Sequence, residues 1–166
     1  SDGSFLEFSP WIALITNIDR EHVDYYGSEE KLRDSFLQFA RSVREKAFVW
    51  GDQPFLKDLA EEAGAITYGW KQHNMIRGDN FSCEGTVSSF DLYKQGQFLC
   101  RVTVPLIGKH NCLNTMAACA VLNYLGLEVI PVVQGLRAFK GTKRRFQIIY
   151  RTEDLTLIDD YAHHPT

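Results

Sequence analysis

Hydrophobic positions in the first half of the chain follow two alternating patterns. Short continuous apolar runs are typical of strands that are buried on both faces of a parallel sheet. Between these runs, apolar residues recur at helical spacing, which predicts amphipathic helices. Pro54 suits the first turn of one such helix, and Gly64 suits its end. The predicted elements are strands over 12–18, 47–50 and 66–68 and helices over 28–43 and 54–63.

The middle of the chain has a different pattern. Two β-like stretches, over 86–93 and 98–106, flank the polar residues 94–97, which predicts an antiparallel hairpin inserted on the main sheet. Gly108 then opens a turn before a predicted helix over 111–125. The remaining predicted elements are a short helix over 131–139 and strands over 145–150 and 155–158.

Strands that alternate with helices favour an α/β fold. We therefore expect a mostly parallel sheet flanked by helices, with a small antiparallel β subdomain beside it. The chain has 166 residues, of which 45% are hydrophobic and 23% charged, so it is long and apolar enough to bury a core of its own. The formal charge of −3 gives no indication of a protein that binds nucleic acid.

Three features predict a protein of the cytoplasm with no membrane partner. No apolar run approaches the roughly 18–20 residues that cross a bilayer. The first residues lack the basic start and the apolar stretch of a signal peptide. The cysteines show no Cys-x-x-Cys spacing, so we interpret them as buried thiols in a reducing compartment rather than as a zinc site or a disulfide framework. They are Cys83, Cys100, Cys112 and Cys119.

The first of four polar clusters, residues 16–24, directly follows the first predicted strand. Open α/β sheets bind their ligands at the carboxyl ends of such strands. Within this cluster His22 is flanked by acidic residues, and a histidine in that setting can bind a metal or carry a proton. The alternative is a solvated loop with no chemical role, because charged loops are common.

The second cluster is Gly108-Lys109-His110-Asn111, followed by Asn114. Asn111 and Asn114 lie three positions apart, so at the start of a helix their amides face the same side. An amide offers a donor and an acceptor together, which matches the edge of an adenine. The alternative is that Asn111 is simply the N-cap of the helix.

The third cluster, residues 140–146, gathers lysines and arginines in a chain that is acidic overall. Arginine can hold phosphate oxygens with two hydrogen bonds and can stabilise charge on a phosphoryl group during transfer. The alternative is a solvated turn before a strand, which is the usual explanation of a charge run.

The fourth cluster, residues 159–165, follows the last predicted strand and combines acids with histidines. Such side chains can bind a metal, ribose hydroxyls or a substrate that carries a carboxylate. A tag or a domain linker is the competing explanation. Because the chain ends on this cluster directly after a strand, we expect the sequence to be truncated.

Together with the opening residues Ser1-Asp2-Gly3-Ser4-Phe5-Leu6 and with Tyr26-Gly27, these clusters fall in the order of the motifs of one family. The chain resembles the Mur ligases, the ATP-dependent amide-forming enzymes of peptidoglycan synthesis. Residues 21–24 and 144–146 look closer to the branch that adds L-alanine to UDP-N-acetylmuramate. A tripeptide-recycling branch of the family has a similar tail.

The resemblance implies a domain organisation and a reaction. Residues 1–152 would be the central ATP-binding domain without its N-terminal part, and residues 153–166 would be the linker strand and the start of a C-terminal domain. In the family, ATP phosphorylates the carboxylate of UDP-N-acetylmuramate to an acyl phosphate, which the amine of L-alanine then attacks. The implied cofactors are ATP and Mg²⁺.

The resemblance also implies roles for individual residues. His22 would be a metal ligand near the acceptor carboxylate, and Arg145 would contact the γ-phosphate and stabilise charge in the transition state. Four residues would bind the nucleotide, with Asp160 on the ribose, and two would begin the amino-acid pocket. The first set is His110, Asn111, Asn114 and Asp160, and the second is Tyr161 and His163.

We expect five patches, the four clusters and the opening residues, to meet around one nucleotide at the mouth of the sheet. The sequence contains no Gly-x-x-Gly-Lys-Thr phosphate loop, so the isolated chain is expected to be inactive. Two alternatives remain open: a nucleotide-binding module without catalysis, and a related ligase such as the tripeptide-recycling enzyme.

Overall fold

The computed structural model describes residues 3–19, 26–139 and 141–161. Its largest unit is a six-stranded sheet with strands in the order β1-β2-β3-β4-β5-β6. The pairs from β1 to β4 are parallel, and the pairs β4–β5 and β5–β6 are antiparallel. The strands are β1 (Ile12–Ile15), β2 (Lys46–Trp50), β3 (Ile66–Gly69), β4 (Ile76–Glu84), β5 (Val87–Lys94) and β6 (Gln97–Val104).

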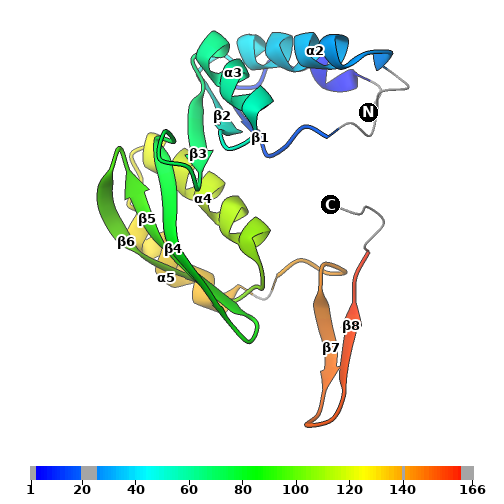
Figure 1. Ribbon diagram of the computed structural model, residues 1–166, viewed down its shortest axis with the longest axis vertical. Coiled ribbons are helices and arrows are strands. Elements are labelled where there is room, and N and C mark those ends of the chain that lie inside the picture. Colours follow the sequence, from blue (N-terminus) through cyan, green and yellow to red (C-terminus); the bar gives the residue numbers. More distant parts are fainter. Residues whose placement is uncertain (1–2, 20–25, 140, 162–166) are drawn as a thin grey trace.

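Helices cover both faces of this sheet (Figure 1). Val49 of β2 packs with α2 (Glu29–Ser42) and α3 (Pro54–Ala63) in one buried cluster. Its neighbour Phe48 points to the other face, where it belongs to the cluster of α4 (Lys109–Tyr124) and α5 (Val129–Gly135). Two short 3-10 helices, η1 (Ser4–Glu7) and η3 (Leu136–Ala138), complete the helical elements among the described residues. The predicted α/β class is confirmed.

Local signals in the sequence explain where α2 and α3 begin and end. The Ser28 hydroxyl accepts a hydrogen bond from the Lys31 backbone N–H at 3.2 Å, which caps α2 as expected. Pro54 lies in the first turn of α3, where a missing N–H is tolerated. Gly64 ends α3 with φ of 64°, a left-handed conformation that glycine adopts without strain.

The sheet differs from the predicted one in two places. β1 ends at Ile15 rather than at Ile18. The prediction also missed β4, because its Gly-Asp-Asn stretch is poor in strand-forming residues. Gly78 has to be small here, since a Cβ atom would lie 2.8 Å from both the Met116 side chain and the Trp70 ring. The predicted hairpin is therefore present as β5–β6, but it continues the main sheet through β4.

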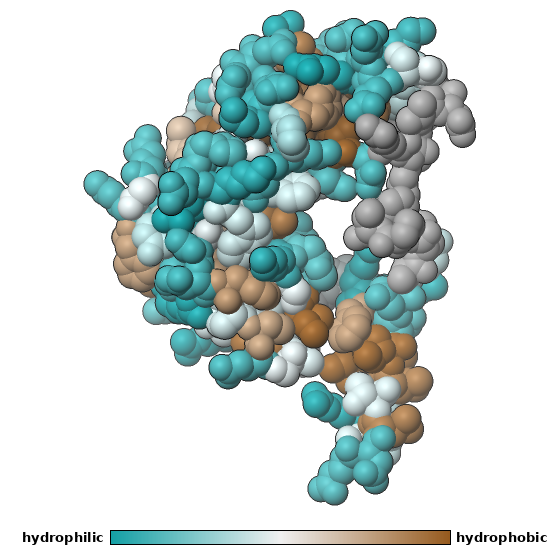
Figure 2. All heavy atoms as spheres, in the orientation of Figure 1, coloured by the Kyte–Doolittle hydropathy of each residue, from teal (hydrophilic) through white to brown (hydrophobic). Residues whose placement is uncertain are grey.

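The strands β7 (Gln147–Arg151) and β8 (Thr156–Asp159) form a separate antiparallel hairpin. It stands apart from the six-stranded sheet, and hydrophobic side chains gather on it (Figures 1 and 2). Neighbouring residues of a regular strand point to opposite faces, and Leu157 and Ile158 of β8 are both exposed, so both faces of the hairpin carry apolar surface. The predicted domain boundary after residue 152 falls between its two strands and stays a prediction.

The sequence predicted the burial of the cysteines correctly only in part. Cys112 and Cys119 are buried as expected, whereas Cys83 is exposed and Cys100 is half-buried, so the prediction was wrong for Cys83. Burial follows position: Cys83 lies near the end of β4, whose last three residues are all exposed. Within the part of the chain that the structure describes, none of the helices is both long and apolar enough to cross a membrane.

Candidate functional site

The orientation of α4 places its first turn at the carboxyl ends of the parallel strands. At its last residue, the Tyr124 hydroxyl donates a hydrogen bond to Glu45, which directly precedes β2. At its first residue, the Lys109 ammonium lies over the ring of Trp70, which directly follows β3. The helix therefore runs antiparallel to the parallel strands. This edge of an open α/β sheet is where ligands bind.

The first turn of α4 carries polar groups on a rigid frame. Gly108 precedes the helix with φ of 98°, and its N–H donates to the buried Ser88 hydroxyl at 3.0 Å. Asn111 Nδ2 donates to the Ile107 carbonyl at 2.8 Å and lies 3.0 Å from His110 Nε2. Asn111 is thus not the N-cap, and that alternative is wrong. With both N–H donors engaged, Asn111 presents its Oδ1 as an acceptor.

His110 in this turn and Asn114, one turn further along, complete the polar surface at the start of α4. Both side chains are exposed, whereas Asn111 between them is half-buried. Asn111 and Asn114 lie on one side of the helix, as their spacing predicted. An acceptor from Asn111 and a full amide from Asn114 can pair with a ring that offers both donors and acceptors.

A thiol also lies in the first turn of α4, but it is not a candidate nucleophile. Cys112 is fully buried, and burial raises the pKa of its thiol to about 11. The thiolate is the reactive form, so Cys112 stays protonated and inert near neutral pH.

The loop after β1 is held by a side chain from the start of α3. Gln53 accepts a hydrogen bond from the Ile18 N–H at 3.3 Å and donates to the Ile18 carbonyl at 2.6 Å. These contacts replace the strand pairing that the sequence predicted for Ile18. Thr16 and Asn17 are exposed at this end of β1.

The predicted metal ligand His22 lies outside the described residues. Among the residues that the structure does describe, no group of three or more His, Cys, Asp or Glu side chains could hold a metal ion.

The cationic third cluster and the terminal fourth cluster contact each other. The Tyr161 N–H donates to the Arg144 carbonyl at 2.8 Å, and the Arg144 guanidinium lies 4.8 Å from the centre of the Tyr161 ring. Arg145 and Asp160 are exposed beside this contact. His163 lies outside the described residues.

One contact places the third cluster against the segment that precedes the second. A Cβ atom on Gly141 would lie 2.9 Å from the side chain of Leu106, so the backbone of Gly141 packs against the segment that leads into α4. The third and fourth clusters are thus joined at Arg144, and Gly141 lies against the segment that leads into the second. Their meeting around one nucleotide, together with the roles of Asn114, Arg145 and Asp160, stays a prediction.

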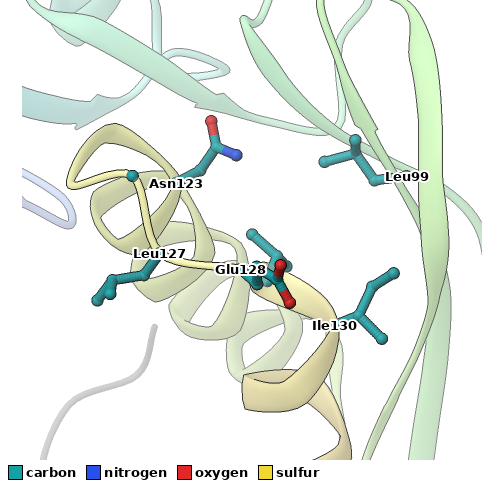
Figure 3. A pocket seen from close by; sticks show the side chains of 7 residues that line it. Leu99, Asn123, Leu127, Glu128 and Ile130 are labelled. Atoms are coloured by element: carbon teal, nitrogen blue, oxygen red, sulfur yellow. The ribbon is translucent and has the colours of Figure 1, made fainter.

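The cavity beside the C-terminal end of α4 is a separate feature. It has a volume of about 440 Å³, and Figure 3 shows the side chains that line it. Asn111 and Asn114 lie at the opposite end of the helix. None of the predicted site residues lines it. The lining residues are Leu99, Asn123, Gly126, Leu127, Glu128, Val129 and Ile130.

Sequence reasoning missed an acidic hub at the end of β2. The Asp52 carboxylate accepts hydrogen bonds from the backbone N–H groups of Trp70 and Lys71, at 2.7 and 2.9 Å, and from Asn74 Nδ2 at 2.7 Å. The Lys71 ammonium donates a hydrogen bond to the backbone carbonyl of Asp52 at 2.9 Å. The position of Asp52 directly after a predicted strand was the available signal.

Lys109, which belongs to the second cluster, makes a contact that the sequence did not predict. Its ammonium lies 5.8 Å from the centre of the Trp70 ring and 5.4 Å from that of Phe81. A cation at a helix N-terminus costs about 0.3–1 kcal/mol against the helix dipole. A cation over an aromatic ring at an exposed site recovers about 0.5–1 kcal/mol. Because the two effects nearly cancel, Lys109 adds little to stability.

Comparison with known proteins identifies the family. Residues 2–122 match the Mur ligase middle domain. A UDP-N-acetylmuramate–L-alanine ligase of Syntrophomonas wolfei is 42% identical over the whole chain, and the match covers 37% of that protein. The chain thus spans little more than a third of the length of this curated relative.

Solved structures agree with this match. The UDP-N-acetylmuramate-alanine ligase MurC of Thermotoga maritima superposes with a TM-score of 0.86 at 29% identity, over 99% of this chain and 37% of that one. A UDP-N-acetylmuramate:L-alanyl-γ-D-glutamyl-meso-diaminopimelate ligase of Neisseria superposes with a TM-score of 0.69 at 25% identity. This match covers 84% of this chain and 43% of that one. The match covers most of the chain, and the chain therefore belongs to the Mur ligase middle domain family.

Proposed function

We propose that this chain is the central part of an ATP-dependent ligase that joins L-alanine to UDP-N-acetylmuramate in peptidoglycan synthesis. The observation that carries the proposal is the 42% identity to a UDP-N-acetylmuramate–L-alanine ligase, in a match that covers the whole chain. The proposed reaction takes place in the cytoplasm, with UDP-N-acetylmuramate and L-alanine as small-molecule substrates.

The geometry at the start of α4 supports adenine binding. Asn111 Oδ1 is positioned as an acceptor, because hydrogen bonds hold its Nδ2 against the Ile107 carbonyl and His110. The exposed Asn114 amide supplies a donor and an acceptor one turn further along. In the proposed function, His110, Asn111 and Asn114 read the adenine edge of ATP at the carboxyl side of the sheet.

The cationic segment supports a role in phosphoryl transfer. Arg145 is exposed next to Arg144, which Tyr161 holds by its ring and by its backbone N–H. We assign Arg145 to the γ-phosphate of ATP as the acceptor carboxylate becomes an acyl phosphate. In such transfers positioning and charge neutralisation carry most of the catalysis.

Asp160, Tyr161 and His163 follow β8, and we assign Asp160 to the ribose hydroxyls and the other two to the amino-acid pocket. The hairpin that precedes them supports a domain junction here, because an isolated two-stranded hairpin is at best marginally stable in water. Its apolar faces would be covered by a C-terminal domain that starts near residue 153.

Mg²⁺ belongs to the proposal as the partner of ATP, with His22 as a ligand. The described residues offer no cluster of metal ligands, so no catalytic step is assigned to the ion. The ion would supply charge neutralisation on the phosphates.

A ligase that adds a tripeptide is the second candidate. The Neisseria enzyme named for that activity superposes over 84% of the chain, against 99% for the alanine ligase of Thermotoga maritima. The difference in coverage and in TM-score, 0.69 against 0.86, favours the alanine branch.

Phosphate release by the longer protein that carries these residues tests the proposal. With ATP, MgCl₂ and UDP-N-acetylmuramate, we expect phosphate release that depends on L-alanine and a product that contains one alanine. Release that depends instead on the tripeptide would favour the second candidate. ATP binding without any release would indicate a nucleotide-binding module without catalysis. The isolated chain of 166 residues is expected to release no phosphate.

A further inference from the structure

Trp70 connects the end of β2 to the start of α4 through a continuous set of contacts. The Asp52 carboxylate accepts the Trp70 N–H at 2.7 Å and thereby fixes the backbone directly after β3. The Trp70 ring then packs edge-on against Phe81 and Phe90, with ring centroids 5.8 and 5.7 Å apart. Asp52 therefore holds the backbone of Trp70, and the two phenylalanines hold its side chain.

The rings of Trp70 and Phe81 form the platform for the Lys109 ammonium, which lies 5.8 and 5.4 Å from their centres. The helix dipole repels a cation at this position, so the helix itself does not hold the lysine there. The aromatic platform does, because its ring faces attract the charge. Lys109 is thus a link between the platform and the first turn of α4.

The first turn of α4 carries the residues that we assign to adenine. His110 and Asn111 directly follow Lys109 in the chain, and they contact each other at 3.0 Å. A rotation of this turn would move both side chains together with Asn114. Whatever holds Lys109 therefore contributes, together with the Gly108–Ser88 hydrogen bond, to the direction in which the adenine readers point.

We propose that Trp70 is a positioning residue for adenine recognition, held by Asp52 and acting through Lys109 on the first turn of α4. This inference rests on the proposed function, because it concerns the residues assigned to ATP. Trp70 does not touch the nucleotide in this account. Its effect should therefore be seen on the binding of the adenosine part of ATP and not on the phosphates.

Lys109→Met in the longer protein tests the link, since Lys109 is exposed and the variant keeps the aliphatic stem. Calorimetry with ATP and, separately, with adenosine measures the two dissociation constants. Loss of the cation–ring interaction should weaken both ligands by the same factor, roughly twofold to fivefold. Lys109→Arg keeps the cation and should stay within about twofold of the unchanged protein. The turnover number at saturating ATP should change less than the Michaelis constant for ATP.

Two further variants complete the design. Trp70→Phe keeps a ring under the ammonium and should weaken both ligands less than Trp70→Leu, and combining Trp70→Leu with Lys109→Met should add little to the larger single effect. Arg33→Met is the matched control: it removes a cation that lies 5.4 Å from the Phe55 ring between α2 and α3, and it should leave both dissociation constants unchanged.

The outcomes separate the inference from the proposed function. Weaker binding of ATP alone would mean that Lys109 touches the phosphates, and it would overturn the positioning role. Unchanged binding of both ligands in Lys109→Met would overturn it as well while leaving the ligase proposal intact. If the unchanged protein binds neither ligand, the proposed function fails and the inference fails with it. Should Trp70→Leu fail to fold, Lys109→Met alone decides.

Discussion

The hydroxyl of Tyr124 donates a hydrogen bond to the carboxylate of Glu45, so the last residue of α4 is tied to the turn that precedes β2. The Tyr124 ring also packs edge-on against Phe48 of β2, with ring centroids 5.6 Å apart. Together these contacts fix α4 antiparallel to the parallel strands. The functional account depends on this orientation, because it directs the opposite end of the helix to the carboxyl edge of the sheet.

Gly51→Ala should destabilise the junction between β2 and the Asp52 hub. An added Cβ atom would lie 2.2 Å from Asn74 Oδ1 and 2.8 Å from Thr67 Cβ, where no side chain can fit without displacement. Overpacking of this kind costs about 1–3 kcal/mol of unfolding free energy. Urea denaturation followed by circular dichroism measures the loss.

Gly135→Ala is the matched control for that substitution. Gly135 is the last residue of α5, has φ of −63°, and would bring its Cβ into open space. Because alanine restricts the unfolded chain, this variant should gain about 0.4–1 kcal/mol. Equal effects of the two substitutions would contradict the packing that we describe around Gly51.

The Asp91 carboxylate should stabilise the folded chain at neutral pH, and acid should remove this stabilisation. The Asp91 carboxylate accepts hydrogen bonds from the Asn80 amide and from the Arg101 guanidinium, which also carries a positive charge. These interactions hold the pKa of the Asp91 carboxyl below its usual value. The unfolded chain then binds the proton more tightly, so the stabilisation is present above a pH of about 4 and is lost as the pH falls through the folded-state pKa. Asp91→Asn should be less stable at neutral pH and should lose less stability than the unchanged chain on acidification. Curves of unfolding free energy against pH that run parallel for the two chains would contradict this prediction.

Reaction with a thiol-specific disulfide reagent should distinguish the four cysteines. Cys83 is exposed and should react first at pH 8, followed by the half-buried Cys100. Burial raises the pKa of Cys112 to about 11 and that of Cys119 to about 12, so both should react only after unfolding. Cys83→Ser should abolish the fast phase. A fast phase that persists in this variant would show that Cys83 is not the exposed thiol.

Arg145→Ala in the longer protein should reduce turnover far more than ATP affinity. In the proposed mechanism the charge that Arg145 neutralises grows only in the transition state. Removing one such contact costs about 3–4 kcal/mol, which corresponds to a fall in turnover number of about a hundredfold to a thousandfold. The neighbouring exposed Lys143 supplies a control, since Lys143→Ala removes a charge of the same segment without the assigned role. An unchanged turnover number for Arg145→Ala would remove this residue from the mechanism.

Much of the fold could be predicted from the sequence because local signals there agree with packing. Ser28 and Gly64 mark the start of α2 and the end of α3 by chemistry that acts within one turn. β4 could not be predicted in this way. Its Gly78 is selected by the approach of Met116 and Trp70, which are distant in sequence.

The candidate site was predictable only in its polar clusters. The amides of Asn111 and Asn114 could be found because helical spacing places them on one side of α4. The hub at Asp52 and the lysine over Trp70 could not, because each depends on contacts between segments that meet only in the folded sheet. The position of an acid after a strand marks a candidate but does not name its partners.

ATP binding by Asn114→Ala in the longer protein tests the central claim most directly, namely that the first turn of α4 reads adenine. We predict that the dissociation constant for ATP, measured by calorimetry, rises by an amount that corresponds to roughly 1–3 kcal/mol, because a buried adenine edge loses its partner. Asn123→Ala, at the other end of the same helix, should leave it unchanged. An unchanged dissociation constant in Asn114→Ala would contradict the account.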